Sequence, residues 1–294
     1  MKKSLLVAAV LISIGSGCLL PNEVGAIAPE YYWDKTNNKW SEPGDYTVAS
    51  PSGNDAKLPV EGFTVSEWDN FYAGYSDGDV KNNSFTIENI TTQIGAVVGG
   101  LSLDGNAEGN AVTISGSSEV EYVYGGASEI GNAKGNTVTI SDESNVSTVA
   151  GGYSGNGNAE GNTVILNGGS TSLVYGGISE GEESIATGNT VRIYDGTIIA
   201  NVIGGIGYKK ASENIVSING GCISGDVYGG KAYKEDGASN NTVNWKAGEI
   251  QGNIYGSISY GEGIYKPVEN NGGTLNIYHS SGSTSKTISE GKSI

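Results

Sequence analysis

The residue types on which most enzyme chemistry depends are nearly absent from this sequence. His279 is its single histidine, and Arg192, in the segment NTVRIYDGT, is its single arginine. Ser-His-Asp triads and histidine-ligated metal sites both need histidines at defined positions. A lyase that acts on polysaccharides pairs an acidic Ca²⁺ cluster with a basic proton acceptor, but Arg192 is expected to point outward from a strand, where a cation is simply solvated.

Carboxylates are the remaining candidates for catalysis or cation binding. Glycoside hydrolysis needs two carboxyl groups at a set separation, and acidic residues are so numerous in the turns that no pair stands out. The segments SDGDVKNN and DGNAEGN resemble Ca²⁺-binding loops but lack the EF-hand and nonapeptide patterns. We therefore expect no enzyme activity and no cofactor, and we predict no catalytic, cofactor-binding or metal-ligating residue. The carboxylate pairs considered for glycoside hydrolysis are Glu182 with Glu183, Asp142 with Glu143, and Glu119 with Glu121.

Composition and charge limit which folds the chain can adopt and which partners it can bind. The 294 residues include 48 Gly and 17 Tyr but only 3 Phe. So much glycine without a G-X-Y period favours a turn-rich β protein over collagen. The net charge of -16 would repel a phosphate backbone, so nucleic acid is not an expected partner.

The N-terminal segment MKKSLLVAAVLISIGSGCLLPNEVGA has the pattern of a secretory signal: two lysines, an apolar run and small residues before the cleavage site. We expect residues 1–26 to be removed by cleavage between Ala26 and Ile27. Lipidation of Cys18 stays open as an alternative, although Gly15 stands where Leu, Val or Ile is usual. If Cys18 is removed, Cys222 is alone and no disulfide can form.

An imperfect repeat runs through most of the chain. A glycine doublet ends at Gly100, Gly126, Gly152, Gly177, Gly205 and Gly230, and Gly74 and Ser257 extend the series. The steps between these positions are 26, 26, 26, 25, 28, 25 and 27 residues, so eight copies run from about residue 71 to residue 279. A second landmark in the same phase is the asparagine at Asn83, Asn110, Asn136, Asn162, Asn189, Asn214 and Asn241.

A repeat of this length predicts the fold. Periods of 20 to 50 residues are typical of solenoids, propellers and arrays, and a propeller blade needs about 40 residues. Within each copy the pattern N-T-V-x-I alternates with period two, which places Val138 and Ile140 on one face. Stacking copies at about 4.8 Å would bury that face and pair every backbone group. The sequence therefore predicts an all-β fold, a single-stranded parallel β-helix (solenoid) of about eight coils of 25–28 residues with an N-terminal cap.

Three rows of residues should line the coils. The asparagine series shares parity with the inward Val two residues later, so we expect a ladder in which each amide bonds to the next. The glycine doublets are interpreted as turns with positive φ or as close contacts between coils. A serine row is expected to form a comparable ladder through Ser102, Ser128, Ser154, Ser179 and Ser259.

Function should lie where the copies differ. The stretch from each doublet to the next asparagine varies from 9 to 12 residues and holds much of the charge, so it forms either a binding edge or a solvated turn. A tyrosine row is either a partly exposed surface for sugar or protein contacts or packing at a bend. The tyrosines are Tyr72, Tyr124, Tyr175, Tyr228 and Tyr255.

The two ends depart from the repeat. Residues 27–70 hold Trp33, Trp40 and Trp68 and are predicted to form an aromatic-rich cap over the exposed sheet edge and open core. Residues 71–279 are the β-helix repeats. Residues 280–294 are rich in Ser, Gly and Lys and are predicted to be a flexible tail.

The units VYGGASEIGNAKGNTVTISD and VYGGISEGEESIATGNTVRIYDG, behind a secretory signal, resemble passenger-domain repeats of autotransporter and filamentous-haemagglutinin-type surface proteins. The resemblance covers about residues 71 to 279 and is specific for architecture rather than activity, since such repeats serve adhesins and enzymes alike. It departs from the family at the C-terminus, where a self-sufficient autotransporter carries a membrane β-barrel. The resemblance therefore implies a separate outer-membrane transporter as partner, or a truncated gene.

We expect a non-enzymatic, secreted or outer-membrane-associated cell-surface protein of a bacterium. The favoured hypothesis is an adhesin that displays variable loops to a host or bacterial surface glycan or protein. Two alternatives remain: a Ca²⁺-dependent polysaccharide-active β-helix enzyme, either a lyase or a glycosidase, and a structural spacer.

Overall fold

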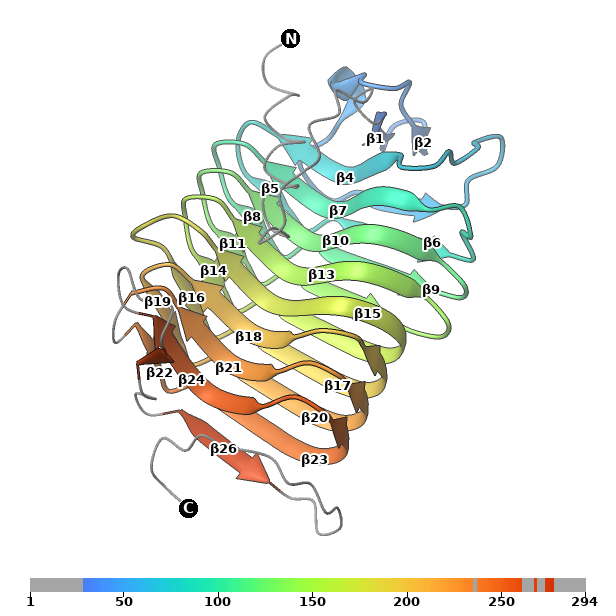
Figure 1. Cartoon of the computed structure of the whole chain (residues 1–294). Helices are drawn as coiled ribbons and strands as arrows, with labels where there is room; N and C mark the ends of the chain where they lie inside the picture. The colour runs from blue at the N-terminus through green and yellow to red at the C-terminus, as the bar shows by residue number, and fades with distance from the viewer. Residues whose placement is uncertain (1–28, 235–236, 261–266, 269–272, 278–294) are drawn as a thin grey trace, which may run out of the picture.

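The computed structural model describes residues 29–234, 237–260, 267–268 and 273–277, which form a parallel β-solenoid of about eight coils (Figure 1). Strands of successive coils pair in parallel, so the predicted all-β parallel β-helix is confirmed. Outside the strands, this part of the chain contains one short 3-10 helix, η1 (Tyr46–Val48). The expected signal peptide, the expected tail 280–294, Cys18 and His279 lie outside the described residues.

The first wall of the solenoid carries the glycine doublets. Its strands stack in parallel with equivalent residues in register; Gly126 pairs with Gly152, and Gly152 with Gly177. The strands are β1 (Glu30–Asp34), β4 (Asn70–Ser76), β7 (Ile94–Ser102), β10 (Glu119–Ser128), β13 (Asn145–Ser154), the second part of β15 (Thr163–Ser179), β18 (Val202–Gly207), β21 (Val227–Ala232) and β24 (Ile254–Tyr260).

The second wall carries the N-T-V-x-I motif, and it joins the first wall in one continuous sheet through the long strand β15. Burial alternates along each strand, as in β12, where Val138 and Ile140 are buried between half-buried neighbours. The strands are β3 (Asp55–Leu58), β6 (Ser84–Glu88), β9 (Ala111–Ser115), β12 (Thr137–Ile140), the first part of β15, β17 (Thr190–Ile198), β20 (Ile215–Ile223), β23 (Thr242–Ile250) and β26 (Thr274–Ile277).

The third wall is a narrow sheet of two- and three-residue strands between each doublet and the following asparagine. An alanine recurs at its inward position, and Ala107, Ala133 and Ala159 are fully buried and in register. A small side chain there lets the wall lie close to the core. The strands are β5 (Val80–Lys81), β8 (Ala107–Glu108), β11 (Ala133–Lys134), β14 (Ala159–Glu160), β16 (Ile185–Thr187), β19 (Lys210–Ser212) and β22 (Ala238–Ser239).

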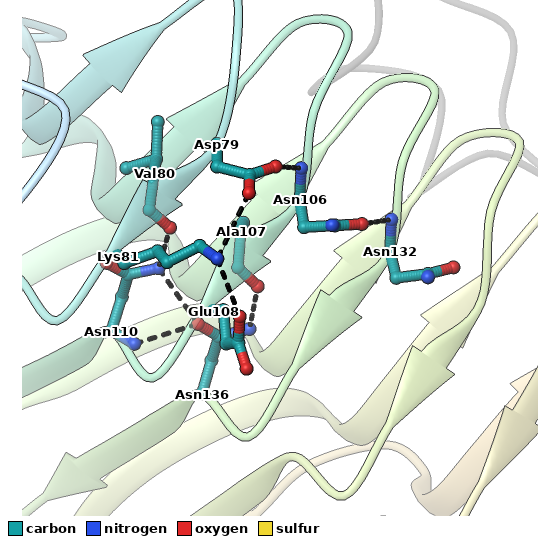
Figure 2. A network of polar contacts seen from close by, with 9 residues as sticks. All are labelled: Asp79, Val80, Lys81, Asn106, Ala107, Glu108, Asn110, Asn132 and Asn136. Atoms are coloured by element: carbon teal, nitrogen blue, oxygen red, sulfur yellow. Dashed lines mark hydrogen bonds and ion pairs between the residues drawn. The ribbon is translucent and has the colours of Figure 1, made fainter.

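The asparagine ladder is present and extends one coil further than the sequence indicates. From Asn54 to Asn241 each Nδ2 donates to the Oδ1 of the next asparagine at 2.7 to 3.0 Å, and each backbone N–H donates to the same oxygen. From Asn110 onward the second Nδ2 hydrogen reaches a backbone carbonyl of the third wall, as from Asn136 to Ala107 at 2.9 Å (Figure 2). Ser257 Oγ accepts the last bond of the ladder, from Asn241. From Asn83 to Asn241 every polar atom of these buried amides is therefore satisfied by stacking, whereas Asn54 Oδ1, at the first step of the ladder, is buried without a hydrogen-bond partner.

The glycine doublets allow close approach, and the interpretation as positive-φ turns is wrong for them. A Cβ on Gly151 would lie 2.6 Å from the Gly176 carbonyl oxygen, and one on Gly152 would overlap the Asn162 side chain. Positive φ instead occurs at the residue before each ladder asparagine. These residues are Gly53, Asn82, Gly109, Gly135, Gly161, Gly188, Glu213 and Asn240.

The serine row bonds differently from the asparagines. Ser128 Oγ donates to the Gly105 carbonyl at 2.7 Å and Ser154 Oγ to the Gly131 carbonyl at 2.8 Å, so each hydroxyl ties its own coil to a loop of the preceding one. The expected hydroxyl-to-hydroxyl ladder is therefore not formed at these positions. Ser259 instead accepts a hydrogen bond from the Ala238 backbone.

At the N-terminal end, β1 and β3 extend the first and second walls by one divergent coil. Trp33 and Trp40, the latter on β2 (Lys39–Trp40), are buried in the aliphatic core with their ring centroids 5.0 Å apart. Trp40 also lies 4.9 Å from Phe71 of the first regular coil. At the other end, β25 (Pro267–Val268) pairs antiparallel with β24.

Candidate binding face

The outward side of the first wall is the most unusual surface of the molecule. In β10, Val123 belongs to the aliphatic core, whereas the next residue, Tyr124, belongs to a separate apolar cluster. Successive side chains of a strand lie on opposite sides, so this second cluster is on the outside. A solenoid wall that faced only water would carry polar residues there. The inner column is Val97, Val123, Val149, Val174, Val202 and Val227, and the outer one is Tyr72, Val98, Tyr124, Ala150, Tyr175, Ile203, Tyr228 and Tyr255.

The N-terminal half of this outward side is closed. Tyr72 and Tyr124 are 1% and 0% exposed, so the predicted tyrosine row is packed in this half. Tyr72 and Tyr32 stack with centroids 5.3 Å apart, and their hydroxyls both donate to the Glu30 carboxylate. Burial raises the pKa of Glu30, and the two phenol hydrogen bonds oppose that shift. These tyrosines hold the coils together.

The C-terminal half is more open and has a second row of tyrosines that the sequence analysis missed. Tyr208, Tyr233 and Tyr260 each follow the second doublet position by three residues. Earlier coils carry Asp77, Leu103, Glu129, Gly155 and Glu180 there. Their ring centroids are 5.9 Å and 6.4 Å apart along the rod. In the parallel outer column, Tyr228 and Tyr255 stack at 5.0 Å with an interplanar angle of 9°. We call Tyr208, Tyr228, Lys231, Tyr233, Tyr255 and Tyr260 the tyrosine face.

Lys231 lies between the two tyrosine columns. It occupies an outward position of β21, in register with Ile206 of the preceding coil and Ile258 of the following one. Its Nζ is 5.1 Å from the ring centroid of Tyr260 and 5.8 Å from those of Tyr228 and Tyr233. Such distances favour cation–π attraction. Burial lowers the pKa of the Lys231 ammonium below its ordinary value.

The carboxylate of Asp226 borders the tyrosine face. Tyr228 donates its hydroxyl to Asp226 Oδ2 at 2.8 Å, which fixes the ring edge, and burial together with this bond raises the pKa of Tyr228. The other Asp226 oxygen accepts the Asn253 backbone N–H at 2.7 Å. Asp226 is thus held by its own coil and the next.

The loops beside the third wall, the predicted variable edge, contain neutralised charges. Lys81 Nζ lies 3.0 Å from Asp79 and 3.2 Å from Glu108 of the next coil (Figure 2). The Asp79 carboxylate also accepts the Asn106 backbone N–H, which begins a second, more exposed ladder through Asn106 to Asn132. This edge is tied together by its own polar contacts.

The carboxylate pairs weighed in the sequence have structural contacts of this kind. Glu183 forms ion pairs with Lys209 and Lys234 of the next two coils, and its hydrogen bond with Lys209 is the main cause of its lowered pKa. Asp142 Oδ2 accepts the Gly116 backbone N–H at 3.0 Å, and Glu121 Oε2 accepts the Ser147 hydroxyl at 3.0 Å. They reinforce the stack between neighbouring coils.

The remaining candidates are scattered over the walls. Arg192 is exposed on β17, in register with Ile165 and Ser217, and Cys222 is a half-buried free thiol on β20. Among the described residues no group of three or more His, Cys, Asp or Glu side chains is arranged to hold a metal ion. In the same part of the chain no helix is long and apolar enough to cross a membrane.

Comparison of the chain with protein-family models, with curated proteins and with solved structures finds no match in any of the three. The fold and the tyrosine face therefore have to carry the functional argument. The two contribute differently: the fold makes successive coils alike, whereas the tyrosine face is where the coils differ.

Proposed function

We propose that the protein is a non-enzymatic adhesin of a bacterial cell surface and that the tyrosine face is its binding surface. The observation that carries this proposal is the open C-terminal half of the first wall, where aromatic rings occupy a position that holds no aromatic residue in earlier coils. Tyrosine supplies a large apolar area with a polar tip at low entropic cost, and it is enriched where proteins bind. A rigid solenoid holds such rings in place without a ligand, which lowers the cost of binding.

The setting we propose follows from the signal sequence and the repeat. The chain would be secreted through residues 1–26 and displayed as a passenger-type rod of the autotransporter or filamentous-haemagglutinin kind, with a separate outer-membrane transporter. Its partners would be a glycan or protein of a host or neighbouring bacterial surface. Brief protease treatment of intact cells should remove the protein while cytoplasmic markers survive; survival of the protein until cells are lysed would contradict surface display.

The binding role is tested with the purified full chain on immobilised glycans, matrix proteins and bacterial polysaccharides with Ca²⁺ present. We expect retention without loss of polymer, and weaker retention of the double variant Tyr233→Ala/Tyr260→Ala. Tyr194→Ala is the matched control, because Tyr194 is 52% exposed on the second wall, away from the tyrosine face. Polymer loss that chelation abolishes would identify the enzyme alternative, and no retention on any surface would favour the spacer.

A further inference from the structure

Lys231 has no carboxylate within ion-pair distance among the described residues and is half-buried, whereas Lys210 and Lys246, which also lack an ion pair in that part of the chain, are exposed. Lys209 and Lys234 both pair with Glu183, and Lys81 pairs with Asp79 and Glu108. The chain has 32 acidic and 16 basic residues, so carboxylate partners are plentiful. Lys231 instead lies half-buried among three tyrosine rings. Its ammonium retains hydrogen-bond donors for a ligand.

We propose that the tyrosine face binds an acidic polysaccharide, with Lys231 pairing a sugar carboxylate and the flanking tyrosines packing against the apolar faces of the sugar rings. This inference rests on the proposed function and names its ligand class. A charge-assisted hydrogen bond from ammonium to carboxylate is stronger than a neutral one, and it is less screened at a half-buried site than on an open surface. The rings supply contact area on both sides of that bond.

The shape and charge of the face favour a linear chain of sugars with carboxylates along its length. Tyr208, Tyr233 and Tyr260 form a column along the rod, so a linear polymer can contact several rings in succession. The face has one unpaired cation rather than a cluster, which suits a uronic acid polymer better than a densely sulfated or phosphorylated one. The net charge of -16 repels every polyanion at long range, so binding of a uronic acid polymer has to come from these contacts at the tyrosine face.

The test uses the full chain and matched pairs of polymers, in each of which methyl esterification removes the carboxylate charge. Polygalacturonate, alginate and hyaluronan are each compared with their methyl-esterified forms by surface binding at fixed ionic strength. We expect at least one acidic polymer to bind and its ester to bind weakly. Lys231→Gln should lower affinity for the acidic form on the order of tenfold and leave affinity for the ester unchanged. Lys246→Gln, an exposed position on β23 of the second wall, is the control and should bind as the unaltered chain does.

The outcomes separate this inference from the proposed function. Binding of acid and ester forms with equal affinity, unaffected by Lys231→Gln but weakened by Tyr233→Ala, would overturn the acidic ligand and keep the tyrosine face as a binding surface. Retention only on neutral glycans or proteins would have the same meaning. Loss of affinity in Lys246→Gln as large as that in Lys231→Gln would show a diffuse charge effect and would also overturn the inference. The thermal unfolding midpoint of each variant verifies that it is folded.

Discussion

The inward and outward sides of the coils follow opposite rules. Inside, the same asparagine occurs in every coil from Asn54 to Asn241, and each one bonds to its copy. Outside, Tyr124, Ala150, Tyr175 and Ile203 succeed one another at equivalent positions with no fixed chemistry. An inward side chain must fit the coil above and the coil below, so the stack dictates its identity. That requirement is weaker where an outward side chain is exposed, as Tyr233 is, and variation there can serve binding.

The sharpest test of this contrast uses two asparagines of one coil, Asn136 and Asn132. The Asn136 side chain donates to Asn162 Oδ1 and the Ala107 carbonyl and accepts from the backbone and side-chain nitrogens of Asn110. Asn136→Ala removes all four bonds inside the core. We expect a loss of unfolding free energy on the order of 4 kcal/mol, since each buried group left unpaired costs about 1–3 kcal/mol. The measurement is the urea midpoint followed by circular dichroism.

Asn132→Ala is the matched control, four residues earlier in the same coil (Figure 2). The Asn132 side chain accepts one bond, from the Asn158 backbone at 2.8 Å, in a half-buried setting. We expect its loss to cost about 1 kcal/mol. Equal shifts of the two midpoints would refute the view that the inner ladder holds the coils together more strongly than the outer one.

The second test concerns the space that the inner ladder requires. A Cβ at Gly152 would overlap the amide of Asn162, so Gly152→Ala must displace a ladder residue. We expect a cost of about 2 kcal/mol, typical of overpacking. The control is Gly78→Ala in an exposed loop, where the nearest atom to a new Cβ is Ser76 Oγ at 3.9 Å. A Gly152→Ala variant as stable as Gly78→Ala would show that the doublet is not needed for close approach.

The sequence predicts the inner side well, and the reason is physical. Because one coil templates the next, the period of Asn136 and Val138 already contains the register, the parity and the ladder. The period does not predict the divergent first coil. Tyr32 pairs with Tyr72 across 40 positions, and Asn54 bonds to Asn83 across 29, and neither spacing is within the 25–28 residues of the other coils.

The outer side is predictable only in part. Tyr208, Tyr233 and Tyr260 share a fixed offset from the doublet, a signal present in the sequence but masked by the earlier tyrosine row. The position of Lys231 among their rings depends on two columns of side chains meeting across neighbouring coils. No repeat period contains that information, because those residues occur in too few coils to form a pattern.

The third test concerns the residue before each ladder asparagine, where φ is positive. Glycine occupies this position in several coils, but Glu213 takes φ 60° in its coil. A side chain in the left-handed region costs roughly 1–2 kcal/mol. Glu213→Gly should therefore stabilise the protein by about 1 kcal/mol. The reverse change, Gly135→Ala, should destabilise it by a similar amount, because Gly135 has φ 63° and open space for a Cβ. Shifts of the same sign in both midpoints would contradict a backbone origin.

The smallest effect is expected at the charged edge. Glu183 forms ion pairs with Lys209 and Lys234, but its side chain is 72% exposed, and water and salt screen such pairs. Glu183→Gln should leave the urea midpoint unchanged within error at 0.15 M salt. Any difference should appear only at low ionic strength, where screening is weak. The urea midpoints of Glu183→Gln and of the unaltered chain are compared over a range of salt concentrations, with Asn132→Ala as a salt-insensitive reference. A large loss at every salt concentration would mean that the variable edge also holds the coils together, and the division between an inward scaffold and free outer surfaces would no longer hold.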